Sequence, residues 1–286
     1  MQFAFNLFGS DQKDWLPIVQ RADQLGYSAV WFADHVITPL NYAAKYPYSP
    51  QGRPNYTTET PIMDPFISIA YMAGQTKRIK LGTGVYILPE RNPVITARVV
   101  ASAHYYSGGR ILFGVGTGWM EEEYQVLGEN FHNRGKRLDE MLDIISLLWS
   151  GNPVEYTGRF YSFPKVRFSP SPETPIPIIF GGETDAALQR AAARGDGWFG
   201  LTGTIEHTLI LVKRLNEFRK KAGREDRPFQ IWARCSDLTL DGVRRYQAAG
   251  LSNITLTLMA DRSAHTLQHK LDGLERFAND VMAKLK

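Results

Sequence analysis

The sequence predicts an α/β fold, a (β/α)8 TIM barrel that forms one domain over residues 1–286. Eight short apolar runs typical of buried strands alternate with segments in which apolar residues recur at amphipathic-helix spacing. Such alternation gives parallel strands joined by right-handed crossovers, and eight units suffice to close a barrel. The length of 286 residues also fits, since about 250 residues are typical. An open, doubly wound sheet is the competing arrangement.

The first half of the chain contains four strand–helix units. The predicted strands are Phe3–Phe8, Ala29–Ala33, Ile79–Gly84 and Ile111–Val115. The predicted helices are Trp15–Leu25, Asp64–Gln75, one that begins near Pro93, and one that carries Leu138 to Trp149. Glycine or proline ends two of these helices, at Gly26 and at Gly151–Pro153.

The second half contains four more units. The predicted strands are Ile176–Phe180, Gly197–Leu201, Phe229–Ala233 and Ile254–Leu258. The predicted helices are Thr184–Arg194, Ile205–Lys221, Leu240–Ala249 and a last one that carries Leu267 to Val281.

Two segments interrupt this pattern, at about 37–61 and 154–177. The first is irregular and rich in Pro, Tyr, Asn and Thr, and its length predicts a lid or a wall of a site. The second is aromatic, basic and rich in proline, and we predict an inserted surface hairpin. We expect both insertions at the C-terminal face of the barrel, shaping a substrate pocket. Their aromatic residues favour an apolar or aromatic substrate (Tyr42, Tyr46, Tyr48, Tyr56, Phe160, Phe163), and three basic residues could face an anionic group or could equally be solvated (Arg159, Lys165, Arg167).

Chemistry in such barrels lies at the C-terminal ends of the strands, so the residues there are the candidates for a site. The second strand ends in Asp34-His35. An Asp beside a His can bind a polar group, fix the imidazole tautomer or place a proton donor that works near pH 7. A histidine that simply packs at the rim of the barrel is the alternative.

Glycines occupy the ends of three other predicted strands. Gly84 follows the third strand, Gly114, Gly116 and Gly118 lie at and after the fourth, and Gly181-Gly182 follow the fifth. A backbone without Cβ atoms can lie flat against a planar ligand, although tight turns are the simpler explanation. Free N–H groups after Gly182, at the helix that begins near Thr184, suit a phosphate, with a turn and helix cap as the alternative.

Composition excludes several classes of function. The net charge of +4 is dispersed, so a nucleic-acid partner is not indicated. No window approaches 18 apolar residues and the first residues lack a signal peptide, so we expect no membrane span and a cytoplasmic protein. With Cys235 as the one cysteine no intrachain disulfide is possible, and a buried, inert thiol is expected.

Other motifs are set aside. The glycines after the fourth strand are not a dinucleotide fingerprint, because Trp119 stands where that motif needs a glycine. His265 and His269 lie four apart but lack a third ligand, so no metal site is predicted. Asp34 and Glu123 could form a carboxylate pair for sugar hydrolysis, but that chemistry leaves the glycine-lined floor unexplained.

Together these motifs resemble the luciferase-like oxidoreductases, the barrel superfamily of bacterial luciferase and of flavin- or deazaflavin-dependent enzymes. The matching segments follow in order along nearly the whole chain: Val30–His35, Leu81–Val85, Arg91–Val94, Ser107–Arg110, Gly114–Trp119 with Glu123, Gly181-Gly182, Ala186–Arg190 and Gly195–Trp198. The pattern is most similar to the branch that uses coenzyme F-420, the 8-hydroxy-5-deazaflavin, although FMN users share much of it.

The resemblance implies a tricyclic ring over the barrel mouth, with a cis peptide before Val85 that forms a bulge against it. His35 with Asp34 would lie near the reactive carbon or the substrate. Trp119 replaces the acid of the deazaflavin sugar-phosphate dehydrogenases, which argues against sugar-phosphate oxidation and leaves His35 or Glu123 as proton donor. The cofactor-binding residues implied are Asp34, Thr83, Gly84, Val85, Gly116, Thr117, Gly118, Trp119, Gly181, Gly182 and Thr184, with the phosphate at Gly181 and Gly182.

The resemblance further implies an oxidoreductase that transfers a hydride between the deazaflavin and a small organic substrate. One alternative is an FMN-dependent monooxygenase that receives reduced flavin from a separate reductase. Another is a flavin-binding barrel without catalytic activity. Relatives commonly form homodimers through helices of the early part of the barrel, so a homodimer is expected.

Overall fold

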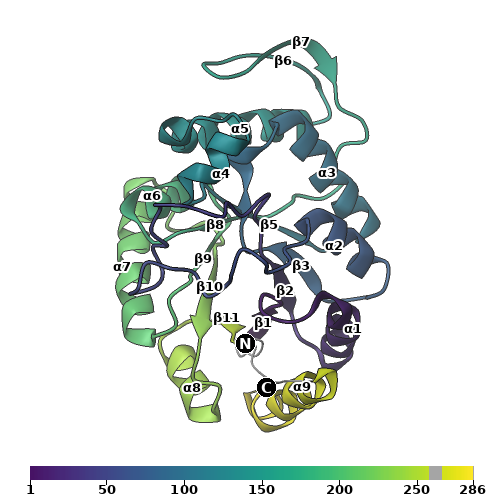
Figure 1. Ribbon diagram of the computed structural model, residues 1–286, viewed down its shortest axis with the longest axis vertical. Coiled ribbons are helices and arrows are strands. Elements are labelled where there is room, and N and C mark those ends of the chain that lie inside the picture. The colour runs from purple at the N-terminus through teal and green to yellow at the C-terminus, as the bar shows by residue number, and fades with distance from the viewer. Residues whose placement is uncertain (258–265, 286) are drawn as a thin grey trace.

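The computed structural model describes residues 1–257 and 266–285, and it shows a ring of strands enclosed by helices (Figure 1). Leu258 of the last predicted strand and His265 lie outside the described residues.

Eight strands close the barrel. They are β1 (Gln2–Asn6), β2 (Ala29–Phe32), β3 (Lys80–Thr83), β5 (Ile111–Gly116), β8 (Ile178–Gly181), β9 (Gly197–Phe199), β10 (Gln230–Cys235) and β11 (Asn253–Leu256). Their order is β3-β2-β1-β11-β10-β9-β8-β5, each neighbouring pair is parallel, and β3 pairs with β5 to close the ring. The barrel prediction is therefore confirmed and the open sheet is excluded. A two-residue strand that the sequence did not predict, β4 (Tyr86–Ile87), continues along β5.

The helices lie around this ring. They are α1 (Trp15–Leu25), α2 (Pro65–Ala73), α3 (Pro93–Tyr106), α4 (Glu121–Val126), α5 (Arg134–Trp149), α6 (Asp185–Arg194), α7 (Ile205–Lys221), α8 (Leu240–Ala248) and α9 (Leu267–Asp280). Short 3-10 turns lie at Gln12–Asp14, Leu88–Glu90, Phe131–Asn133 and Met282–Leu285. The caps explain several boundaries: Asp64 accepts bonds from the first turn of α2, and Gly26 ends α1 at φ +88°. Among the described residues, no helix combines the length and apolarity that crossing a membrane requires.

Aromatic side chains fill the inside of the barrel. The ring of Trp31 meets the rings of Phe199 and Trp232 edge-on, at centroid distances of 4.8 and 5.3 Å. Gly82 makes room for them, because a Cβ there would lie 2.4 Å from the Trp31 ring. A Cβ on Gly114 would lie 1.7 Å from the carbonyl oxygen of Thr83. Gly114 thus permits β3 and β5 to close the barrel, and the interpretation of this glycine as part of a ligand floor is wrong.

The long segment 37–61 runs across the front of the barrel (Figure 1) and contains neither helix nor strand. Two of its tyrosines, Tyr42 and Tyr46, pack edge-on against Trp119 in the loop after β5, at 5.9 and 5.2 Å. The hydroxyl of Tyr48 approaches Gly182 in the loop after β8. The prediction that this segment forms a wall over the strand ends is confirmed.

The second insertion is the hairpin β6 (Pro153–Thr157) and β7 (Ser162–Arg167), as predicted. It joins the end of α5 to the start of β8, and in Figure 1 it extends beyond α5, outside the ring of helices. A segment between a helix and the next strand returns to the N-terminal end of the barrel. Only the two ends of the hairpin are placed in this way, and its tip packs on Glu140 of α5. The expectation that this insertion, with Arg159, Lys165 and Arg167, shapes the pocket at the mouth finds no support in these contacts.

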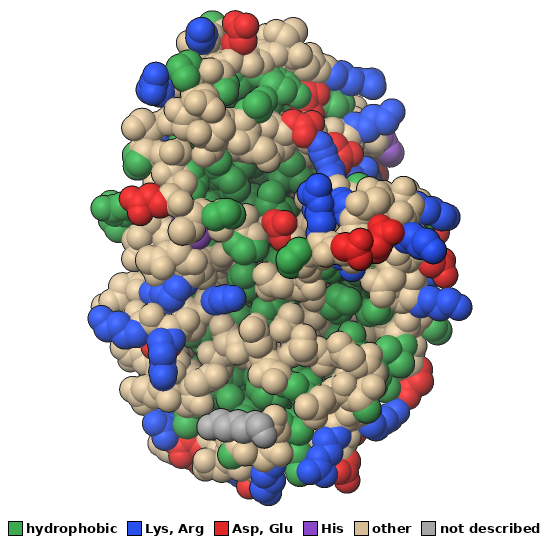
Figure 2. Space-filling view, turned by 180° about the vertical axis from the view of Figure 1, so that it is seen from behind, with side chains coloured by type: hydrophobic (Ala, Val, Ile, Leu, Met, Phe, Trp, Pro, Cys, Tyr) green, Lys and Arg blue, Asp and Glu red, His purple; other side chains and the backbone are tan. Residues whose placement is uncertain are grey.

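Charged side chains are interspersed on the face that Figure 2 shows, where Lys and Arg alternate with Asp and Glu. Cys235 is fully buried, as expected, and burial raises the pKa of its thiol to about 11. A thiol of this kind is unreactive at neutral pH.

Candidate active site

Val85 and two glycines form a compact platform at the barrel mouth. The register of β5 and β8 pairs Val115 with Phe180, so Gly116 lies beside Gly181. The Val85 side chain fills the space that both glycines leave: a Cβ on Gly116 or Gly181 would lie 2.6 or 2.7 Å from its methyl groups. The Gly84–Val85 peptide is cis, as the resemblance implies. The structure thus brings together Gly84, Val85, Gly116 and Gly181, and a flat cofactor ring would fit on this surface.

The loop after β5 has a fixed shape that presents Trp119. Gly118 has φ +65°, and a Cβ there would also meet the side chain of Ile87 at 2.8 Å. Tyr124, buried in α4, donates its hydroxyl hydrogen to the carbonyl of Thr117 at 2.7 Å. The indole nitrogen of Trp119 is buried and has no hydrogen-bond partner among the described residues, so a ligand could supply one.

His35 lies between a carboxylate and a phenol. Its Nδ1 is 2.8 Å from Oε2 of Glu123, and its Nε2 is 3.1 Å from the hydroxyl of Tyr56. A carboxylate accepts only, so Nδ1 carries the proton and Nε2 of the neutral ring accepts the hydroxyl hydrogen of Tyr56. Burial raises the pKa of Tyr56, which therefore stays protonated. The imidazole is 11% exposed and lies 6.3 Å from the Trp119 ring, at the mouth.

Glu123, not Asp34, orients the imidazole. Oε1 of Glu123 also accepts hydrogen bonds from the backbone N–H groups of Val36 and Ile37, at 2.6 and 3.2 Å. The neighbouring Glu122 accepts from the backbone of Ala43 and Ala44. The acids at the start of α4 therefore hold the first part of the 37–61 segment as well as His35.

Asp34 forms a buried ion pair below this group. Its two oxygens receive hydrogen bonds from both terminal nitrogens of Arg91, at 2.8 and 2.7 Å, and the N–H of Ile87 adds a third. Burial raises the pKa of Asp34, whereas Arg91 and the Ile87 bond lower it. Burial disfavours the charge of Arg91 too, yet Asp34 raises its pKa, so two partners in bidentate contact remain charged. Asp34 thus ties the end of β2 to Arg91 and to β4.

A second buried acid, Glu90, lies beside Glu123. Its side chain is fully buried, and the nearest cation, Nη1 of Arg91, is 4.0 Å away. Neither carboxyl oxygen has a donor partner among the described residues. Burial, followed by the charges of Glu123 and Asp34, raises the pKa of Glu90 to about 9. Sequence reasoning missed this residue, because a lone Glu after Leu-Pro is typical of an ordinary surface acid.

Two residues predicted to bind the cofactor form side-chain hydrogen bonds within the protein. The hydroxyl of Thr83 is fully buried and donates to the carbonyl of Gly114 at 2.6 Å. Thr184 caps α6 by accepting from the N–H of Ala187 at 3.3 Å. The structure therefore supports the helix-cap interpretation of Thr184, while the backbone of Gly182, at φ +107°, stays next to the mouth.

Arg234 is another residue that the sequence analysis missed. It lies at the end of β10 and donates to the carbonyl of Leu201 at 3.0 Å, close enough to Tyr46 to lower the tyrosine's pKa against the effect of burial. Within the described part of the chain, no carboxylate forms an ion pair with it. A guanidinium beside the aromatic wall that pairs with no carboxylate among the described residues could bind an anionic group of a ligand.

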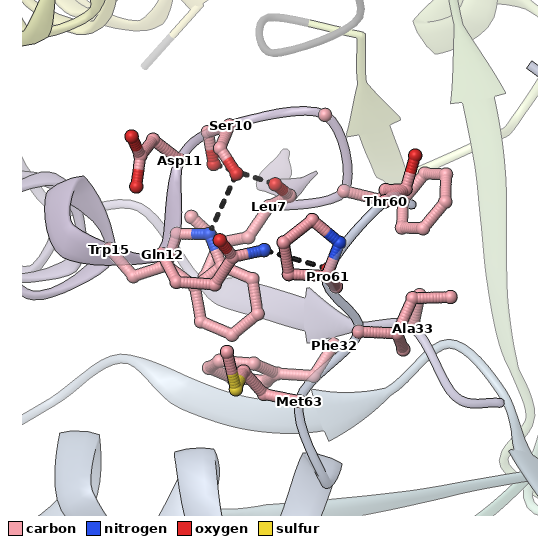
Figure 3. Close-up of a pocket in the computed structure, with 13 residues that line it drawn as sticks. Leu7, Ser10, Asp11, Gln12, Trp15, Phe32, Ala33, Thr60, Pro61 and Met63 are labelled. Atoms are coloured by element: carbon pink, nitrogen blue, oxygen red, sulfur yellow. Dashed lines mark hydrogen bonds between the residues drawn. The ribbon is translucent and has the colours of Figure 1, made fainter. Parts of the chain in front are cut away.

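A cavity of about 350 Å³ lies between the loop after β1 and residues 60–63 (Figure 3). Most of its lining is apolar and includes Leu7, Phe8, Trp15, Phe32 and Met63. Phe8 contacts the ring of Tyr56 edge-on at 5.5 Å, so the cavity adjoins the tyrosine that binds His35. Its size and lining suit a small apolar molecule.

The described residues contain no cluster of three His, Cys, Asp or Glu side chains that could hold a metal ion. Of the two histidines His265 and His269, the first lies outside the described residues.

Comparisons with known proteins agree with this geometry. A family model described as luciferase-like monooxygenase matches residues 9–242. The chain is 34% identical over 290 residues to an uncharacterized protein of Mycobacterium tuberculosis, and the match covers 100% of both chains. Among solved structures, the coenzyme F420-dependent tetrahydromethanopterin reductase of Methanopyrus kandleri has a TM-score of 0.76 at 16% identity, over 100% of this chain and 99% of that one.

Two curated relatives differ in their cofactor. An F420-dependent glucose-6-phosphate dehydrogenase of Amycolatopsis mediterranei is 27% identical over 195 residues, which is 67% of this chain and 54% of that protein. The oxygenase component of a flavin-dependent trigonelline monooxygenase of Acinetobacter baylyi is 31% identical over 175 residues, which is 60% of this chain and 43% of that protein.

Proposed function

The chain belongs to the luciferase-like monooxygenase family, and within it we propose an oxidoreductase that transfers a hydride between coenzyme F-420 and a small apolar or aromatic substrate. The observation that carries the proposal is the orientation of His35, which Glu123 and Tyr56 hold beside the ring of Trp119. A cytoplasmic location, which a single buried thiol permits, belongs to the proposal.

The residues of the platform would hold the cofactor. Val85 with Gly116 and Gly181 offers a glycine-lined surface for the ring, and the unpaired indole N–H of Trp119 offers a donor at its edge. Arg234, which has no carboxylate partner among the described residues, would bind an anionic group of the cofactor or the substrate. When bound, the deazaflavin supplies the hydride chemistry, and the protein contributes binding, orientation and proton transfer.

His35 would manage the proton that accompanies hydride transfer. Reduction of a carbonyl or an activated double bond needs a proton, and oxidation of an alcohol releases one. The Nε2 of His35, next to the hydroxyl of Tyr56, is placed to exchange this proton. Glu123 keeps Nδ1 protonated and the ring in one orientation. With Trp119 in the place of an acid, these residues are the proton-transfer group at the mouth.

The aromatic wall and the adjoining cavity support an apolar substrate. Tyr42, Tyr46 and Trp119 pack together over the strand ends, and the cavity beside Phe8 is mostly apolar. Segment 37–61 covers this region and would exclude water from the reaction.

FMN is the alternative cofactor. The identity of 31% to a flavin-dependent oxygenase component favours it. An FMN enzyme of this kind would work as a monooxygenase, using reduced flavin from a separate reductase.

Cofactor binding tests the proposal. Purified protein is titrated with oxidised and reduced F-420 and with FMN and reduced FMN, and affinity is measured by fluorescence quenching. We expect F-420 to bind at least about tenfold tighter, a difference of about 1.4 kcal/mol. A preference for FMN establishes the alternative, and no binding of either cofactor contradicts both. With the bound cofactor, His35→Ala should lower kcat/KM by about 10²- to 10⁴-fold while the cofactor Kd stays unchanged.

A further inference from the structure

The carboxyl group of Glu90 lies in a space where no donor reaches it. Its side chain is fully buried, and both of its oxygens lack a donor among the described residues. Oε1 faces Gly118, where a Cβ atom would lie 3.6 Å from it. The glycine therefore covers the acid without offering it a polar side chain. A buried carboxylate without hydrogen bonds is costly, whereas a neutral acid in the same place needs one acceptor only.

Glu123 provides that acceptor. The Glu123 carboxylate is the group whose charge acts most strongly on Glu90, and a hydrogen bond between the two carboxyl groups requires one of them to carry a proton. Glu123 already accepts from Val36, Ile37 and His35, and such bonds stabilise its charged form. Glu90 accepts from none of these groups. The proton therefore belongs on Glu90.

We propose that Glu90 is a positioning residue of the active site: as a neutral carboxylic acid it donates a hydrogen bond to the Glu123 carboxylate and holds that carboxylate against Nδ1 of His35. The relation to catalysis rests on the proposed function of His35, but the protonation and the contact do not. The chain Glu90–Glu123–His35–Tyr56 then carries four hydrogen-bonding groups of defined direction from the buried side of the mouth to the aromatic wall.

The surrounding charges agree with a neutral Glu90. Asp34 and Glu123 are negative and face it, Arg91 is the nearest cation, and Tyr124 packs from α4. Arg137 of α5 donates to the carbonyl of Pro89 and pairs with Glu129, so its charge is already matched. If Glu90 is neutral, the charge of Asp34 is balanced by that of Arg91. Among these acids, only Glu123 then carries a further charge, and its hydrogen bonds stabilise that charge. An ionised Glu90 would face the charges of both Glu123 and Asp34, with Arg91 as the cation nearest to it.

Carbon-13 NMR of the wild-type protein, labelled at the glutamate carboxyl, is the first test and requires no cofactor. We expect one glutamate carboxyl to titrate well above pH 7. If every glutamate carboxyl completes its titration below pH 6, Glu90 is ionised in the folded protein and the proposal is wrong.

Two variants test the positioning role through nitrogen-15 NMR of the His35 ring. Glu90→Gln mimics the neutral acid and keeps a donor, so we expect the titration midpoint and tautomer of His35 to be preserved. Glu90→Leu has no donor, and we expect the ring to become a mixture of tautomers. If Glu90 were ionised, Glu90→Gln would remove a nearby negative charge and lower the His35 midpoint by about one unit or more.

The control is Glu121→Gln, which removes an acid from α4, the helix that carries Glu123, at a partly exposed position. It should leave His35 unchanged, which separates a local hydrogen bond from a general effect of charge. Preserved tautomers in Glu90→Leu would show that Glu90 only fills space, contrary to the proposal. If the variants do not fold, the wild-type titration alone decides. None of these readouts depends on which cofactor binds, so a preference for FMN leaves them intact.

Discussion

At the mouth of the barrel, two neighbouring carboxylates, Glu123 and Asp34, bind different partners. Glu123 accepts hydrogen bonds from three donors and orients the imidazole of His35. Asp34, the residue before His35 in the chain, accepts hydrogen bonds from Arg91 and Ile87 instead. Adjacent positions at the end of β2 thus have separate roles, one structural and one facing the site.

Glu90 should make the stability of the protein depend on pH. Its pKa is about 9 in the folded chain because of burial and the nearby Glu123, against an ordinary value of 4.5. Between these values folding takes up a proton, so this group lowers the free energy of unfolding as the pH rises. Glu90→Gln cannot titrate, and its stability relative to wild type should increase from pH 5 to pH 9, by at most about 1.4 kcal/mol per unit. Urea unfolding at pH 5, 7 and 9 measures this, and a constant difference would contradict it.

Gly181 tests the platform. A Cβ at this position would lie 2.7 Å from a methyl group of Val85, which must then move. We expect Gly181→Ala to weaken cofactor binding about tenfold or more, since small displacements at such a surface are costly. Gly273→Ala in α9 is the control, because nothing lies within 4 Å of its Cβ position. The control should retain full affinity and gain slightly in stability through helix propensity. Equal affinity in both variants would show that the platform does not hold the ring.

At the scale of elements, the two insertions have opposite fates. Segment 37–61 follows a strand and therefore belongs to the C-terminal face, where it meets Trp119 and Gly182. The hairpin β6–β7 follows a helix and lies beside α5. The order of elements alone decides between these faces, and applying it to residues 154–177 would have placed the hairpin correctly from the sequence.

The hairpin is attached to α5 through Glu140. The carboxylate accepts hydrogen bonds from the backbone N–H groups of Arg159, Phe160 and Tyr161, at 2.9 to 3.2 Å. Glu140→Ala leaves these donors without a partner and should lower the free energy of unfolding by about 1–3 kcal/mol. Glu155→Ala, an exposed acid of the same hairpin, should change it little. Urea unfolding measures both, and kcat/KM should not change in either. A loss of activity in Glu140→Ala without loss of stability would show that the hairpin contributes to the active site.

The sequence was sufficient for the elements and for the glycines that meet at Val85, because strand periodicity and register determine where strand ends gather. It was not sufficient for the partners of each polar group. Glu123 reaches His35 across 88 positions, and Arg91 reaches Asp34 across 57. Such contacts depend on how the loops fold back over the mouth, and no local pattern encodes them. Arg234 and Glu90 went unnoticed for the same reason.

At the scale of the whole molecule, we propose a homodimer formed through α2 and α3. These neighbouring helices expose apolar side chains at helical spacing, Ile67 and Tyr71 on α2 and Ile95 and Val99 on α3, with Ile67 73% and Ile95 66% exposed. An exposed apolar face of this kind is typical of an interface between proteins.

Charge reversal on this face tests the dimer. Ile67→Glu combined with Ile95→Glu should yield a monomer by light scattering after size exclusion, because charges at the centre of an interface cannot be desolvated without partners. Ile210→Glu, at an exposed apolar position of α7, should leave the mass unchanged. A wild-type protein that is already monomeric at micromolar concentration would rule out this interface.

The burial of Cys235 has a practical consequence for following the molecule in motion. Its thiol is inaccessible and resists deprotonation, so maleimide dyes or nitroxide spin labels should ignore the native protein. A cysteine introduced at the exposed position of Asn55 would then take up one probe per molecule against a silent background. Fluorescence anisotropy or electron paramagnetic resonance from that probe would report directly how the covering segment responds when a cofactor arrives.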